Sequence, residues 1–358
     1  MSFFIRRNVL IRKGTISFGS ILILMTVFLY LLFPEKSEAN PQYLIKFATV
    51  APDGSTWIRH MKLLDKDLRS KSDNRLGFRI YAGGIAGDEL DVLKKIRIGQ
   101  LNCAAFSGVG FGRVLPLVRV LDLPFLTRSD EEIDRLQKAL RPFFEKQFRE
   151  KGFELLSWAE VGDVHLFSKK RIDRVEDLSK RKVWAWSNDP VAKATFNSMG
   201  INPIFLAITD VTTAINRGMV DTVYAPPLGA IALQWHCQMK FMMALPLSHS
   251  TGAVLLSSRF FSRLPEELKP MLKQGFDSAM ARLTSELRTQ TREIIELIKQ
   301  KDFIVTPKPK GKELQRFFDL HKMVASDLSE RFFPKSLLER VYNILDRPRT
   351  EASGYCDQ

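Results

Sequence analysis

The chain has 358 residues, 45% of them hydrophobic, and a formal net charge of +14. This length allows a large buried core and is expected to give two domains. The excess of basic over acidic residues suits binding to anionic lipid headgroups, anionic solutes or an acidic partner. Because no helix-turn-helix, zinc-finger or RNA-binding signature accompanies it, we predict that the protein binds no nucleic acid.

The N-terminus reads as a targeting segment. Basic residues between Arg6 and Lys13 precede an uncharged apolar run from Ile16 to Phe33. Ser37-Glu38-Ala39 then offers small residues at the two positions that a signal peptidase reads, so residues 1–39 are predicted to be a signal peptide cleaved after Ala39. The run of residues 16–33 is also just long enough to span a bilayer, and an uncleaved inner-membrane anchor is the alternative. Both interpretations predict export to the periplasm.

Strands and amphipathic helices alternate after the leader, which predicts an α/β fold. In the first part we expect a helix over 55–70, a helix beginning after Asp88 and a helix over 129–150. The predicted strands of this part are 43–49, 76–81, 101–107 and 152–161.

A second α/β unit is predicted from Val164 to about Leu247, followed by a strand that returns to the first unit. The predicted strands are 164–168, 182–186, 201–205, 221–225, 239–243 and 252–258. Apolar residues at helical spacing then predict a long helix over 265–301, and two more helices over 310–327 and 334–346.

Several segments carry a family resemblance. They are FATVAPDGSTWIRHMKLLDKDL (47–68), GGIAGDELDVLKKIRIGQLNCAAFS (83–107), VLDLPFLTRSDEE (120–132), DLSKRKVWAWSNDP (177–190), NRGMVDTVYAPP (216–227) and SSRFFSRLPEEL (257–268). In order and spacing they resemble the DctP-type solute-binding proteins of tripartite ATP-independent periplasmic (TRAP) transporters, over about residues 43–300.

The resemblance implies a two-lobed periplasmic binding protein of the type II-like class, with a long helix spanning both lobes. Lobe I would comprise residues 43–163 plus about 250–280, and lobe II residues 164–249. Residues 265–346 would supply the spanning helix and the C-terminal helices. The family also implies hinge closure around a solute and delivery to membrane permease subunits, without ATP at this subunit.

This sequence departs from the family pattern at the ligand contacts. Family members usually place an arginine, which grips the carboxylate of the solute, where this chain has Trp184. A second arginine position of the family is filled here by Val164. An indole offers an apolar face and one N–H donor, whereas arginine offers two parallel donors. We therefore expect an apolar or amphiphilic ligand, such as a lipid, fatty acid, sterol or aromatic compound.

Strand alternation places Lys182, Trp184 and Trp186 on one face of the 182–186 strand. The further residues expected to line the ligand site are Trp158, Phe106, Phe125, Tyr224 and Trp235. A local shift of the alignment would instead let Lys182 or Arg181 replace the missing arginine and hold a small organic acid. A lipid shuttle anchored to the membrane, without a permease, is a further alternative.

No enzyme is predicted, because the sequence supplies no convincing nucleophile, acid–base pair or metal site, and no cofactor is expected. The glycine-rich stretch Ser107–Gly112 lacks the lysine of a phosphate-binding loop and is interpreted as a tight loop at the cleft mouth. The three cysteines, Cys103, Cys237 and Cys356, are too far apart to suggest a disulfide framework or zinc site. Cys103 and Cys237 are expected to be buried, and Cys356 to be a thiol in the tail.

Overall fold

The first three strands form a parallel β-α-β-α-β unit. The structure is a computed structural model that describes residues 40–299 and 303–346, so the predicted leader and Cys356 lie outside the described residues. Strand β1 (Tyr43–Ala48) pairs in parallel with β2 (Leu76–Tyr81) and with β3 (Cys103–Ser107). Helices α2 (Thr56–Lys71) and α3 (Glu89–Arg97) connect these strands, as the apolar spacing predicts.

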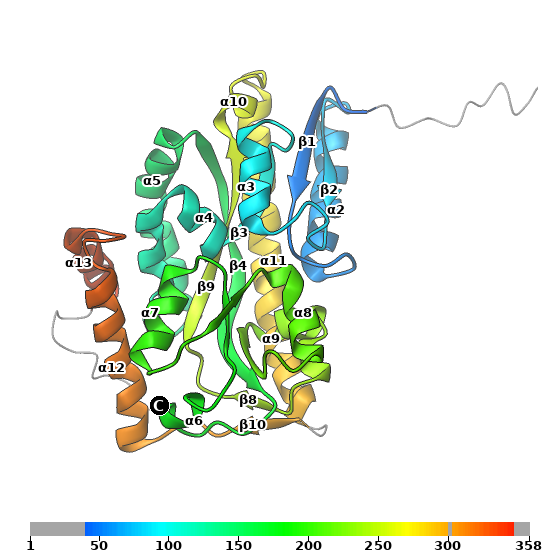
Figure 1. Cartoon of the computed structure of the whole chain (residues 1–358). Helices are drawn as coiled ribbons and strands as arrows, with labels where there is room; N and C mark the ends of the chain where they lie inside the picture. Colours follow the sequence, from blue (N-terminus) through cyan, green and yellow to red (C-terminus); the bar gives the residue numbers. More distant parts are fainter. Residues whose placement is uncertain (1–39, 300–302, 347–358) are drawn as a thin grey trace, which may run out of the picture. The chain divides into compact units, whose positions relative to one another are not determined.

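Two long antiparallel strands, β4 (Phe153–Ser168) and β9 (Ser248–Ser257), form the centre of the sheet (Figure 1). The sequence predicted two strands, 152–161 and 164–168, where the structure has the continuous strand β4. The predicted break corresponds to a register shift between Glu160 and Gly162, and Gly162 has a φ of 109°. A bulge bends a strand without ending it, and glycine adopts positive φ at no steric cost.

The central strands β4 and β9 join two parts of the sheet. The first part contains β1–β3, and the second contains β7 (Thr222–Ala225), β8 (Phe241–Met243) and β10 (Ile304–Thr306). Strand β9 pairs with β3, and the end of β4 pairs with β7 and β8. The edge strand β10, which the sequence patterns do not predict, pairs with β8. The sheet order is β10-β8-β4-β9-β3-β1-β2, with β7 on β4. Because β4 runs through both parts, the two are continuous at the backbone.

A second, two-stranded sheet contains Trp184 and Trp186. Strand β5 (Trp184–Trp186) pairs in parallel with β6 (Ile204–Leu206), and Val183 bridges to Thr222 at the start of β7. Helix α7 (Pro190–Ser198) follows β5, and helix α8 (Ile208–Asn216) follows β6. Asp189 is the N-cap of α7 and Pro190 is its first residue, so a cap and a proline fix where this helix begins.

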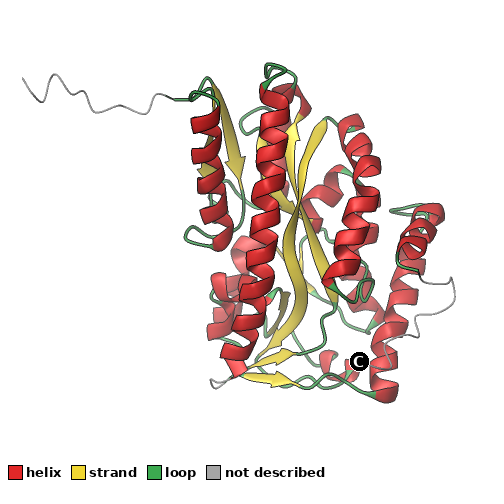
Figure 2. Ribbon diagram, turned by 180° about the vertical axis from the view of Figure 1, so that it is seen from behind, coloured by secondary structure: helices red, strands yellow, loops and turns green. Residues whose placement is uncertain are grey.

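Helix α11 (Leu268–Lys299) contacts α2 in the first part of the molecule and both α9 (Pro227–Ala232) and β10 in the second. Figure 2 shows this long helix running along one face of the sheet. The predicted spanning helix is therefore present, close to its expected bounds. The remaining elements are α4 (Gly108–Val114), η1 (Pro116–Asp122), α5 (Asp130–Glu150), α6 (Val175–Leu178), η2 (Trp235–Cys237), α10 (Ser258–Phe261), α12 (Gly311–Leu328) and α13 (Lys335–Ile344).

Candidate ligand-binding site

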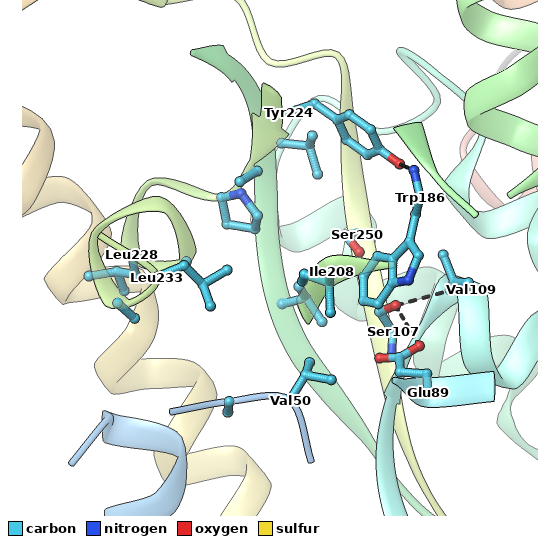
Figure 3. A pocket seen from close by; sticks show the side chains of 18 of the residues that line it. Val50, Glu89, Ser107, Val109, Trp186, Ile208, Tyr224, Leu228, Leu233 and Ser250 are labelled. Carbon is cyan, nitrogen blue, oxygen red and sulfur yellow. Dashed lines mark hydrogen bonds between the residues drawn. The ribbon is translucent and has the colours of Figure 1, made fainter. Parts of the chain in front are cut away.

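A cavity of about 430 Å³ lies between the two parts of the sheet. Its lining comes from the loop after β1, from β3 and α4, from β5 and α7, and from α9 and β9. Figure 3 shows Leu228 and Leu233 on one side of the cavity and Trp186 and Glu89 on the other. This size is in the range of small-molecule sites, and most of the lining residues are apolar or aromatic.

Trp184, Tyr224 and Trp235 form an aromatic wall of the cavity. The Trp184 ring stacks on Tyr224 with 5.0 Å between centroids and meets Trp235 edge-on at 5.3 Å. Its Nε1 donates to the backbone oxygen of Leu206 at 3.1 Å. The indole donor is thus satisfied by the protein, and the Trp184 and Trp235 rings, each only 1% exposed, pack mainly against their neighbours behind the cavity surface.

The predicted alternation of the strand is correct for residues 183–186. Trp184 and Trp186 belong to one buried cluster, whereas Val183 and Ala185 belong to another on the opposite face. The Nε1 atom of Trp186 donates to the Asp88 carboxylate at 2.9 Å. Burial raises the pKa of Asp88, while the hydrogen bond from Trp186 lowers it by a smaller amount. Asp88 is the N-cap of α3, so this contact links β5 to the first part of the molecule.

Four ionisable residues, Glu89, Arg119, Asp122 and Asp189, form a charged cluster in the lining. Arg119 Nη2 donates to Asp189 Oδ1 at 2.7 Å, and Arg119 Nε lies 3.2 Å from Asp122 Oδ2. Burial lowers the pKa of Arg119, but the charges of Asp189 and Asp122 raise it above its usual value overall. Burial raises the pKa of Asp122 to about 6. Arg119 therefore stays charged inside the protein because carboxylates surround it.

Glu89 is the fourth member of the charged cluster. Its carboxylate accepts hydrogen bonds from Ser107 N at 2.7 Å and Gly110 N at 2.8 Å. It also accepts one from Ser107 Oγ at 2.9 Å (Figure 3). Burial raises the pKa of Glu89 to about 7, against the lowering effect of these hydrogen bonds. The carboxyl group is therefore held in place and titrates near neutral pH.

The glycine-rich stretch was wrongly predicted to be a loop at the cleft mouth. It forms the N-cap and first turns of the buried helix α4, and its glycines make room for the charged cluster. A Cβ on Gly108 would lie 2.1 Å from Asp122 Oδ2, and one on Gly112 would lie 2.4 Å from Arg119 Cδ. A Cβ on Gly110 would lie 2.3 Å from the Phe106 ring. The spacing of the glycines is thus explained by close packing.

Six of the nine residues predicted from the sequence line the cavity: Phe106, Val164, Trp184, Trp186, Tyr224 and Trp235. Their role in ligand binding remains a prediction. The charged cluster was not among the predicted site residues. Its signal was the pair Arg119 and Asp122, two charges three residues apart inside an otherwise apolar run.

The other three predicted residues do not line this cavity. Lys182 is exposed, and its Nζ donates to the backbone oxygen of Gly218 at 3.0 Å. Trp158 is buried against Phe111 and Phe144. Phe125 packs edge-on against two phenylalanines of α12. Arg181, the alternative anion contact, is also absent from the lining. Side-chain parity alone could not show which aromatic residues belong to the core.

Cysteine and metal chemistry adds no site within the described ranges 40–299 and 303–346. Cys103 is buried, as predicted, but Cys237 is exposed because it lies in the short turn η2 at the surface, which corrects the prediction for that residue. No group of three or more His, Cys, Asp or Glu residues in these ranges is placed to hold a metal ion. In the same ranges, no helix combines the length and apolar character needed to cross a bilayer.

Comparisons with known proteins show the family of this chain. The family model described as "Bacterial extracellular solute-binding protein, family 7" matches residues 47–329. The ectoine-binding periplasmic protein TeaA of Halomonas elongata is 23% identical over 294 residues, which cover 77% of this chain and 83% of TeaA. A solute-binding protein of Verminephrobacter eiseniae is 23% identical over 266 residues, which cover 71% of this chain and 79% of the relative.

A solved structure shows the same fold. The sugar acid binding protein of Advenella mimigardefordensis, in complex with galactonate, superposes with a TM-score of 0.79 at 18% identity. The match covers 85% of this chain and 97% of that protein. Together with the family model, these matches show a two-lobed α/β binding protein. The chain belongs to the bacterial extracellular solute-binding proteins of family 7, the periplasmic solute-binding components of TRAP transporters, which are not enzymes.

Proposed function

We propose that this TRAP solute-binding protein captures an apolar or amphiphilic ligand and delivers it to its membrane permease subunits. Capture uses hinge closure between lobe I (43–163 plus about 250–280) and lobe II (164–249), with residues 265–346 bracing both. The ligand occupies the cavity and shifts the open–closed equilibrium, because only the closed form lets both lobes contact it.

The aromatic wall is the observation that carries this proposal. At the position where family members usually have an arginine, Trp184 presents a ring whose single donor already binds Leu206. A carboxylate would therefore find no free donor at Trp184, whereas the mostly apolar lining of the cavity favours hydrocarbon. Each 100 Å² of apolar surface that leaves water contributes about 2.5 kcal/mol. Trp186, Val164 and Phe106 extend the lining around the aromatic wall.

A small organic acid is the second candidate ligand. It is favoured by two solved structures of similar fold, one with galactonate and one with succinate. In the arrangement expected from the sequence, Lys182 or Arg181 would hold the acid. The exposed position of Lys182 and its bond to Gly218 weigh against this arrangement.

The anchored lipid shuttle depends on the leader, which lies outside the described residues. Sequencing the mature N-terminus separates the two cases. A chain that begins at Asn40 is released after cleavage, whereas one that begins at Met1 keeps residues 16–33 as an anchor.

The decisive experiment is native mass spectrometry of the purified protein, with solvent extraction and identification of whatever co-purifies. We expect a molecule with substantial hydrocarbon surface. Trp184→Ala should weaken its binding at least about tenfold, because the ring that holds Tyr224 and Trp235 in place along the cavity is lost. Trp158→Ala, which removes a buried indole outside the cavity, controls for general destabilisation. Unchanged affinity in a folded Trp184→Ala protein, or a co-purified small carboxylate, would contradict the proposal.

A further inference from the structure

The pair Arg119–Asp189 brings two distant segments together at the cavity. Arg119 belongs to η1, and Asp189 is the N-cap of α7, 70 positions further along the chain. Both side chains line the cavity although they are only 5% and 6% exposed. The pair therefore forms part of the ligand site and is shielded from bulk water.

Arg119 is the only basic residue among the described residues that line this cavity. Its Nη2 is taken by Asp189, and its Nε faces Asp122. Its buried Nη1 has no hydrogen-bond acceptor among the described residues. The guanidinium is thus the one cavity group that could hold an anionic ligand, and most of its donor capacity faces the protein's own carboxylates.

The Asp189 carboxylate has surroundings that would suit the carboxylate of a bound acid. Besides the guanidinium, its Oδ1 accepts from Val191 N at 3.0 Å and Ala192 N at 3.2 Å, at the N-terminus of α7. Tyr224 Oη lies 3.5 Å from Oδ2. Backbone N–H groups of a helix start, together with a guanidinium, are the standard donors for an anion.

The charge balance opposes a second anion at this place. Three carboxylic residues, Glu89, Asp122 and Asp189, line the cavity against the single guanidinium. A free acid that took the position of the Asp189 carboxylate would have to displace it from Arg119 Nη2 and would then lie near Asp122. Both steps cost free energy, because an unpaired charge in a buried site is strongly unfavourable.

We propose that Asp189 is a specificity-determining residue whose carboxylate fills the carboxylate position on Arg119 and α7, and so excludes small organic acids from the cavity. This inference rests on the proposed function, since it explains how the site rejects the acids that neighbours hold. The protein supplies the anion itself, and the ligand contributes apolar surface. Asp189 is then the residue whose removal would convert the site to acid binding.

Replacing Asp189 with a smaller residue, which empties the space of its carboxylate, tests the proposal. Asp189→Ser keeps a good N-cap for α7 while vacating the space of the carboxylate, and Asp189→Gly vacates more space at a small cost to the cap. Asp189→Asn is the matched control, because it removes the charge but leaves the space filled. Binding of acetate and succinate is measured by calorimetry, and folding is checked by circular dichroism.

We expect the wild-type protein and Asp189→Asn to bind neither acid measurably. Asp189→Ser or Asp189→Gly should bind succinate at least about tenfold more tightly than the wild type does. A charged hydrogen bond to Arg119 contributes about this factor to the affinity. Acetate should also raise the melting temperature of the opened variants and leave that of the wild type unchanged. For a variant that is only marginally stable, the shift in melting temperature shows whether the acid binds.

The outcomes separate the two proposals. If both opened variants fold and neither acid binds them better than the wild type, the role of Asp189 is refuted. The apolar function then stands as long as the co-purified ligand is apolar. If the wild-type protein itself binds succinate as tightly as the opened variants, both proposals fail.

Discussion

The aromatic wall and the charged cluster satisfy their polar groups in opposite ways. In the aromatic wall, the Trp184 donor binds a backbone oxygen and the Trp235 donor binds Thr212 Oγ1 at 3.0 Å, which leaves apolar ring faces. In the charged cluster, the ionisable groups are buried and bind one another or backbone N–H groups. Burial of the rings is favourable by itself, whereas burial of the charges is tolerated only while the set is complete. The cluster is therefore the more fragile of the two regions.

The largest effect should come from removing the cation of the charged cluster. Arg119→Met leaves Asp122 and Asp189 buried without their partner, and breaking such a pair costs about 3–5 kcal/mol of the free energy of unfolding. Urea denaturation measures this loss. The double variant Arg119→Met with Asp189→Asn should recover part of it, because one stranded charge is gone. Equal stability of the single and double variants would show that the two groups are not coupled.

Titration of Glu89 should make the contribution of the charged cluster to stability depend on pH, whereas the aromatic wall has no such dependence. Because burial raises its pKa from 4.5 to about 7, the folded protein favours the protonated carboxyl group. Its stabilising contribution is fully present below pH 4.5 and is lost as the pH rises through about 7, a change of about 3 kcal/mol. Unfolding of the wild type and Glu89→Gln at pH 5 and pH 8 measures it. The advantage of the wild type over the variant should shrink at the higher pH.

The control for this titration comes from the aromatic wall. Trp184→Phe removes no ionisable group, so its stability difference from the wild type should be the same at both pH values. A similar pH dependence in both variants would mean that the effect does not originate in the charged cluster.

The smallest effect is expected outside both regions. Lys182 is exposed and bonds to Gly218, away from the cavity lining, so Lys182→Ala should change affinity for the co-purified ligand less than about twofold. Calorimetry with the extracted ligand measures this. A large loss would restore the alternative in which Lys182 holds an acidic head.

Local patterns predicted much of the fold because they depend on neighbours in the sequence. The alternation in residues 183–186 placed Trp184 and Trp186 on one face, and helical spacing gave α2, α5 and α11 near their observed bounds. The same patterns failed for β4, since a bulge at Gly162 resembles a strand end in sequence. They also placed Trp158 and Phe125 in the site, although an aromatic side chain packs equally well in a core.

Contiguous residues carried enough information to predict most of the strands and helices and the family. Only the tertiary structure decided that Arg119 meets Asp189, 70 positions away, and that Gly108 and Gly112 make room for that cluster. A buried charge needs a partner in space, and nothing in the local sequence specifies which distant carboxylate the fold brings to it. The packing of β5, α4 and η1 around one cavity makes that choice.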